Sequence, residues 1–164
     1  MTAQHSPNDG TGGAQRIRAG GIVVGYDGSA AGTAALRWAL AEARRRAARV
    51  TAALVSEPDT AFVPAMAMGL NPHGARRARR ALALAVEEVV LDTPGTTPAV
   101  RVDTAELTGR SGQVLARAAR GADLLVIGAH HRRPRLADGV GAFAADVIRH
   151  AGCPVVVVPA TGRP

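Results

Sequence analysis

The amino-acid sequence predicts an α/β protein in which five parallel strands form a doubly wound sheet with helices on both faces. Two observations predict this fold. Short, almost uncharged runs rich in β-branched residues recur along the chain, and such runs are typical of strands that are buried on both faces. Between them lie longer segments whose apolar residues repeat at helical spacing, so the connections are long enough for right-handed crossovers. In such sheets, ligands bind at the carboxyl ends of the strands.

The first strand and helix follow a polar segment. Residues 1–16 contain Gly, Asn, Ser, Pro and Gln without apolar periodicity, so we expect a disordered tail before a single domain over residues 17–160. The first strand is predicted at Ile22–Tyr26. Ser29 is expected to cap a helix that runs to about Ala47. The apolar face of that helix consists of Leu36, Leu40, Ala43 and Ala47.

The second strand and helix are separated by a loop. We predict the strand at Val50–Ser56, the loop at residues 57–71, and a helix that begins at Pro72 or Gly74 and ends near Leu91. The arginines of this helix are expected mostly on a solvated face, as charge runs usually are. They do not indicate a nucleic-acid surface, because such a surface would have aromatic residues interleaved with the cations. Its apolar face consists of Ala75, Ala78, Leu82, Val86 and Val89.

The third strand is predicted at Val100–Ala105, where apolar and polar residues alternate as in a more exposed strand. Ser111 is expected to cap a helix over Gly112–Arg120, and Gly121 should end it. The inward face of this helix consists of Val114, Leu115 and Ala118.

The next segment has the order of an anion-binding site. A buried strand at Leu124–Ile127 ends at Gly128, a loop rich in His and Arg follows, and Gly141 precedes a helix at Phe143–His150. Backbone N–H groups of such a loop and helix start converge where a phosphate can lie, and the helix dipole favours its negative charge. A fifth strand at Val155–Val158 completes the sheet, and residues 161–164 form a short tail.

Length and composition limit the classes of function. The 164 residues suit one domain with a substantial core. The net charge of +7 is carried by arginine without any lysine, which we attribute to codon usage rather than to nucleic-acid binding. A lone Cys153 excludes an internal disulfide and fits a reducing compartment. No apolar run approaches the ~20 residues of a membrane span, and no signal-peptide pattern is present, so we expect a cytoplasmic protein.

Three stretches together resemble the universal stress protein family. They are Val23–Ser29, the strand that ends at Ile127–Gly128 with its glycine loop, and Cys153–Pro159. The resemblance covers about residues 17–160 and implies a single-domain, Rossmann-like member with a site for an adenine nucleotide such as ATP. The site residues implied by family position are Gly25, Tyr26, Asp27, Val55, Ile127, Gly128, His131, Arg132, Gly141, Ala142 and Phe143.

The glycine loop departs from the family pattern at two positions. Nucleotide-binding members have Gly, two residues, Gly, nine residues, and then Gly followed by Ser or Thr. Gly128 and Gly141 match, whereas His131 replaces the second glycine and Ala142 replaces the hydroxyl residue. A Cβ beside the phosphate costs ~1 kcal/mol or more, and a lost hydroxyl bond to phosphate costs roughly 1.5–3 kcal/mol. The ATP site is therefore expected to be weakened about thirtyfold to thousandfold.

Two features of the implied site have a second interpretation. Arg132, Arg133 and Arg135 could pair with phosphate oxygens, or they could form a solvated basic loop. The resemblance places Asp27 beside the adenine and ribose, but an Asx-turn at the end of the first strand explains the same residue without a ligand. Val55 would face the adenine, or is an ordinary strand residue.

No group of residues in the sequence requires an enzyme. His130, His131 and His150 lack the spacing of a zinc site, and Cys153 is expected to be a small buried hydrophobic residue. We therefore predict no catalytic residues, no metal, and neither nucleic acid nor membrane as a partner. Two functions are favoured: a stress-response protein that binds an adenine nucleotide, and a protein-interaction module that has kept the fold without the nucleotide. A third, slow ATP hydrolysis, stays open but lacks a visible base or metal ligand.

The fifth strand predicts a homodimer. It is wholly apolar and ends the domain, so we expect it at an edge of the sheet, where unpaired N–H and C=O groups favour pairing with another strand. Antiparallel pairing with the same strand of a second copy would close both edges. The resemblance implies the same contact, because family members often dimerise through this strand. The residues expected at the interface are Val155, Val156, Val157 and Val158.

Overall fold

The computed structural model describes residues 17–56, 72–95, 99–129 and 141–159. Its strands form one sheet in the order β3-β2-β1-β4-β5, and every neighbouring pair is parallel. This arrangement confirms the predicted five-stranded, doubly wound α/β fold. The strands are β1 (Ile22–Gly25), β2 (Val50–Ser56), β3 (Val102–Thr108), β4 (Leu124–Ala129) and β5 (Val155–Pro159).

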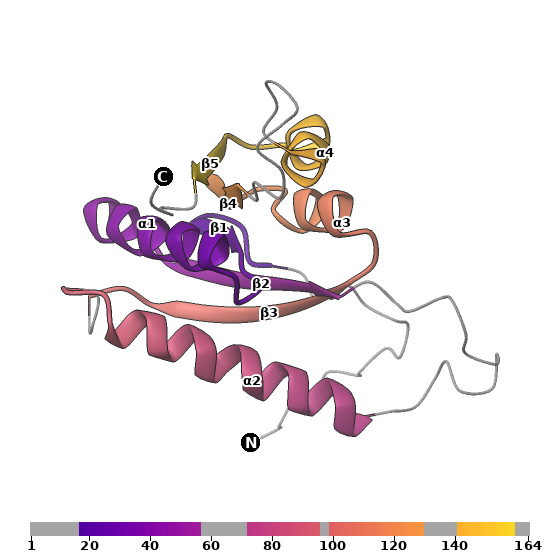
Figure 1. Ribbon diagram of the computed structural model, residues 1–164. Coiled ribbons are helices and arrows are strands. Elements are labelled where there is room, and N and C mark those ends of the chain that lie inside the picture. The colour runs from indigo at the N-terminus through magenta and orange to yellow at the C-terminus, as the bar shows by residue number, and fades with distance from the viewer. Residues whose placement is uncertain (1–16, 57–71, 96–98, 130–140, 160–164) are drawn as a thin grey trace, which may run out of the picture.

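Helices pack on both faces of this sheet. The helices of the described residues are α1 (Ala30–Arg46), α2 (Pro72–Leu91), α3 (Ser111–Ala118) and α4 (Ala142–His150). Two apolar clusters separate the layers: α1 and α2 pack on one face, and α3 and α4 on the other. In Figure 1, α2 lies beside β3 at one end of the sheet, and α4 lies near β4 and β5 at the other end.

The central strands are the most deeply buried. β4 is buried along its whole length, and Ile22, Val23 and Val24 of β1 are almost inaccessible to solvent. Alternate residues of β1 point to opposite faces, so Val24 joins the cluster under α1 and α2 while Val23 joins the cluster under α3 and α4. Burial on both faces explains why these segments lack the polar alternation of a half-exposed strand.

The first helix begins and ends as expected, but one residue of its predicted apolar face is exposed. The Ser29 hydroxyl accepts a hydrogen bond from the Gly32 N–H at 3.0 Å, which confirms Ser29 as the cap of α1. Ala47 was predicted on the apolar face, and that prediction is wrong. It is exposed and adopts a left-handed conformation with φ 50°, which ends the helix.

Two other boundaries differ from the sequence prediction. β3 begins two residues later than expected and continues to Thr108, because all of its seven residues pair with the seven of β2. Ser111 is the first residue of α3 rather than its cap. The capping position is Arg110, which makes no side-chain capping bond. Pairing with β2 thus sets the ends of β3, and the turn after β3 places the start of α3 one residue earlier than expected.

Several predictions concern residues outside the described ranges. They are the tails at residues 1–16 and 161–164, the loop at residues 57–71, and the loop residues from His130 to Val140. The side chains of Ala75 and Ala78 also lie outside the description, whereas Leu82, Val86 and Val89 are buried as the helical spacing of α2 predicts.

Candidate functional site

A cavity lies at the carboxyl ends of β1 and β4, where the strand order changes direction. The sheet runs outward through β2 and β3 on one side of β1 and through β4 and β5 on the other. At such a topological switch point the loops that leave adjacent strands diverge and open a crevice. The cavity has a volume of about 220 Å³. Its lining residues are Gly25, Tyr26, Asp27, Gly32, Ala53, Val55, Leu115, Gly128 and Phe143.

Among the described residues, the lining is mostly apolar and contains one charged side chain. That side chain is Asp27, which follows β1 directly, while Val55 of β2 and Phe143 of α4 supply apolar walls. Tyr26 is only 6% exposed and belongs to the core. The volume is below the ~300–1,000 Å³ that encloses a whole drug-sized ligand, so the cavity suits a flat ring system with part of a polar attachment.

Asp27 is held by the first turn of α1. Its Oδ1 atom accepts hydrogen bonds from the backbone N–H of Ser29 at 3.0 Å and from the Ser29 hydroxyl at 2.6 Å. The first of these bonds closes the Asx-turn that the sequence suggested. The same carboxylate also lines the cavity, so the turn fixes its position there and both interpretations of Asp27 are compatible.

One glycine of the site, Gly128, is required by packing against backbone, and a second, Gly25, lies close to a side chain. A Cβ atom at Gly128 would collide with the backbone of Ala31 in the first turn of α1. A Cβ atom at Gly25 would come within 2.8 Å of Leu115 Cδ2 on α3. Glycine at these positions therefore lets α1 and α3 approach β4 and β1 closely, whether or not a ligand is present.

The amino terminus of α4 opens beside this cavity. Gly141 precedes the helix with φ 86°, a conformation that favours glycine, and its position carries no side-chain capping bond. Ala142 is the first helical residue and is exposed. Phe143, the next residue, lines the cavity wall. Through Phe143 the helix start therefore lies beside the cavity, and its N–H groups and the helix dipole would favour an anion there.

The wider sequence comparison identifies the family. A sequence model of the universal stress protein family matches residues 20–159. This chain belongs to that family. The matched segment includes every described strand and helix, so the family's shared domain corresponds to the fold described above.

Solved structures agree with this assignment. The universal stress protein UspA from Lactobacillus plantarum is 26% identical, with a TM-score of 0.65, and the match covers 85% of this chain and 97% of that one. A universal stress protein in complex with cAMP is 21% identical, with a TM-score of 0.57, covering 87% and 98%. The universal stress protein from Archaeoglobus fulgidus in complex with dAMP is 22% identical, with a TM-score of 0.53, covering 84% and 96%. Comparison with curated proteins found no match.

The residues implied for the nucleotide site of this universal stress protein fall into four groups. The first group lines the cavity and consists of Gly25, Tyr26, Asp27, Val55, Gly128 and Phe143. The second group, Gly141 and Ala142, lies at the start of α4. Ile127 does not line the cavity: its side chain is fully buried in the core. His131 and Arg132 lie outside the described residues, as do Arg133 and Arg135.

Three lining residues were not found by sequence reasoning. Gly32 and Leu115 come from helices α1 and α3, and Ala53 comes from the middle of β2. Gly32 had a local signal, since it lies in the helical turn that Ser29 caps. Leu115 was predicted only as a core residue, and no local pattern distinguishes a core leucine that also faces a cavity.

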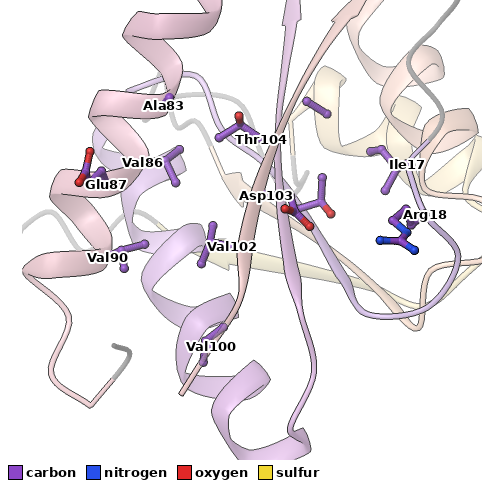
Figure 2. Close-up of a pocket in the computed structure, with 12 residues that line it drawn as sticks. Ile17, Arg18, Ala83, Val86, Glu87, Val90, Val100, Val102, Asp103 and Thr104 are labelled. Carbon is purple, nitrogen blue, oxygen red and sulfur yellow. The ribbon is translucent and has the colours of Figure 1, made fainter. Parts of the chain in front are cut away.

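A larger cavity of about 700 Å³ lies at the β3 edge of the sheet. Figure 2 shows Val86 and Val90 of α2 on one side of β3 and Arg18 on the other. The carboxylates that line it belong to Glu87 and Asp103, so an anionic ligand would meet like charge there. This cavity is therefore a poorer candidate for a nucleotide than the smaller one at the switch point.

The remaining candidates from the sequence have no site geometry in the described residues. Burial raises the pKa of the Cys153 thiol, which disfavours the reactive thiolate. Within the described ranges, no group of three His, Cys, Asp or Glu side chains could hold a metal ion. The described helices include none that is long and apolar enough to cross a membrane.

Proposed function

We propose that this universal stress protein is a cytoplasmic, non-enzymatic binding protein for an adenine nucleotide. The observation that carries the proposal is the cavity at the switch point, with apolar walls and one fixed carboxylate. An adenine ring fits between apolar walls, and a carboxylate is a strong acceptor for the hydroxyl groups of a ribose. Structures of family members in complex with cAMP and dAMP support an adenine nucleotide as the ligand class.

The phosphate end of the nucleotide would lie at the start of α4. Gly141 supplies an uncapped helix start, which favours an anion. Ala142 cannot donate the hydroxyl bond expected at this position, and His131 replaces a glycine in the preceding loop. We therefore propose a site that holds the base and ribose and binds the phosphates weakly.

The test is a titration with a series of ligands. Any nucleotide that copurifies with the protein is first extracted and identified, and adenosine, AMP, ADP and ATP are then titrated by calorimetry. Because the weakness lies at the phosphate end, we expect little gain in affinity from AMP to ATP in the wild-type chain. The variant His131→Gly with Ala142→Ser should bind ATP at least about tenfold more tightly, since it regains a hydroxyl bond to phosphate. A wild-type Kd for ATP in the low micromolar range would contradict a weakened phosphate site.

The base and ribose end has its own matched variant. Asp27→Asn keeps an oxygen that can accept the bonds of the Asx-turn but removes the negative charge. If Asp27 accepts hydrogen bonds from a ribose, this variant should bind adenosine and ATP about three- to tenfold more weakly, with an unchanged melting temperature. If Asp27→Asn binds adenosine and ATP with the affinity of the wild type, Asp27 closes the Asx-turn and does not bind the ligand.

A second candidate function is a protein-interaction module that acts as a homodimer through β5. The observation that favours it is the position of β5 at the sheet edge, where Val155–Val158 are half-buried and pair only with β4. The Leu125 N–H donates to the Pro154 carbonyl at 2.9 Å. Because main-chain directions alternate along a strand, the N–H groups of Val155 and Val157 point away from β4, toward a strand that could be added. If the titration detects no nucleotide binding and the chain is a dimer in solution, the interaction module is favoured over the nucleotide-binding function.

A further inference from the structure

The outer face of α2 carries exposed leucines opposite its core face. Leu84 is 57% exposed and Leu91 is 71% exposed, and they are seven residues apart, so they lie on one stripe of the helix. Leu82 and Val86, which flank Leu84, are buried against the sheet. These two leucines leave apolar surface on the outward side of α2 that a partner could cover, and the charges around them indicate which partner fits.

Charged residues surround Leu84 in an order that complements itself. Arg77 and Arg80 are exposed on the amino-terminal side of Leu84, and Glu87 and Glu88 are exposed on its carboxyl-terminal side. At 3.6 residues per turn, all four lie on the outward half of the helix, with the two leucines. Within the described part of the chain, Arg80 and Glu88 form no ion pair. One half of this face is therefore basic and the other half acidic.

We propose that this face of α2 binds the same face of a second copy of the chain, with the two helices antiparallel. A two-fold axis through Leu84 places residues at equal distances before and after it opposite one another. Arg80 of each copy then meets Glu88 of the other, and the two Leu84 side chains meet at the axis. Arg77 meets Leu91 of the other copy, and its aliphatic stem covers that leucine. A parallel pairing would instead bring like charges together.

The α2 face lies at the end of the sheet away from β5. α2 packs beside β3, whereas β5 pairs with β4 at the opposite edge (Figure 1). The α2 contact can therefore form whether or not a second copy is added at β5. Where no second copy is added at β5, the α2 contact turns a monomer into a dimer. Where β5 also pairs, the α2 faces at both ends of that dimer join further copies and the mass rises beyond twofold. In both cases loss of the α2 contact lowers the mass, so its test does not depend on the proposed function.

The experiment is a charge-reversal exchange followed by light scattering. Arg80→Glu and Glu88→Arg each place like charges opposite one another, so each variant should have a lower mass than the wild-type particle, and half of it where β5 does not pair. The predicted loss of affinity is at least about tenfold at low salt, because two symmetry-related pairs change sign. In a 1:1 mixture of the two variants, opposite charges face one another again at both contacts, so the mixture should regain the wild-type mass. The double variant Arg80→Glu with Glu88→Arg should regain it alone.

Controls separate this contact from general charge effects. Arg117→Glu reverses an exposed charge on α3 and should keep the wild-type mass. Circular dichroism should show equal helix content in all variants, since the altered side chains are exposed. The wild-type mass should fall in about 0.5 M NaCl. The proposal is overturned if the wild-type chain has the same mass as Arg80→Glu at low salt. It is also overturned if the mixture of the two variants fails to regain the wild-type mass. That failure is the result expected if this surface binds a different protein.

Discussion

The two edge strands of the sheet, β3 and β5, differ in charge and in what lies beside them. β3 contains two carboxylates, Asp103 and Glu106, within seven residues, and α2 packs next to it. β5 has five residues without a charge, and its four valines are half-buried. Charged side chains and a covering helix discourage the addition of another strand, whereas an apolar edge invites it. The comparison indicates that one edge of this molecule is protected and the other is open for pairing.

The same comparison holds for the main-chain groups. The Val50 N–H donates to the Arg101 carbonyl at 2.9 Å, so by alternation the N–H of Thr104 points away from β2. Val157 is its counterpart on β5, with an N–H that points away from β4. Thr104 on β3 and Val157 on β5 are therefore mid-strand positions where proline removes an outward donor and leaves the internal ladder intact. These two positions form a matched pair for mutagenesis.

The largest expected effect is loss of the dimer in Val157→Pro. Proline removes an outward N–H from the proposed β5 contact, and its ring obstructs a strand that approaches this edge. Light scattering at high salt, where the α2 contact is weak, should fall from about twice 16.7 kDa to 16.7 kDa. Thr104→Pro is the matched control at the β3 edge and should keep the wild-type mass. A dimer that persists in Val157→Pro would place the interface elsewhere.

A smaller effect is expected from Val156→Pro, which acts inside the sheet. The N–H of Val156 points toward β4, so proline removes an internal ladder bond and leaves a carbonyl unpaired, at a cost of about 2–4 kcal/mol. For a chain of this size the melting temperature should fall by roughly 4–16 °C. In thermal denaturation, Thr104→Pro should melt within a few degrees of the wild type. Equal melting temperatures of Val156→Pro and Thr104→Pro would contradict the inference that the Val156 N–H points toward β4. That inference rests on the bond between the Leu125 N–H and the Pro154 carbonyl.

The smallest effect is expected when the carboxylates of β3 are removed. Asp103→Thr with Glu106→Thr makes this edge neutral, as β5 is, and should increase aggregation on heating about twofold, because α2 still protects the strand. Turbidity during slow heating measures this change. Ala41→Arg with Gln113→Arg raises the net charge by the same two units on α1 and α3, away from β3 and from the α2 face, and should show no such increase. If both pairs aggregate equally, net charge rather than edge protection is responsible.

Sequence alone determined the elements and their types. Uncharged β-branched runs such as Leu124–Ile127 report burial on both faces, and helical spacing in α2 identified Leu82, Val86 and Val89 as core residues. Ser29 was identified as a cap because its hydroxyl bonds a backbone group only three residues away. These features depend on short-range geometry, so the local sequence contains them. The starts of β3 and α3 were misplaced, because the first depends on pairing with β2 and the second on the turn after β3.

Tertiary structure alone decided which residues share the cavity. Asp27 and Gly128 are about a hundred residues apart in the chain, and they meet because β1 and β4 are neighbours in the sheet. Gly128 was interpreted as a phosphate-binding glycine, but the fold shows that the backbone of Ala31 leaves no space for a Cβ there. Strand order and helix packing are set by long-range burial and chain crossovers, which no local pattern records. For the same reason, only the packing of the opposite face of α2 shows that Leu84 and Leu91 lie on the protein surface.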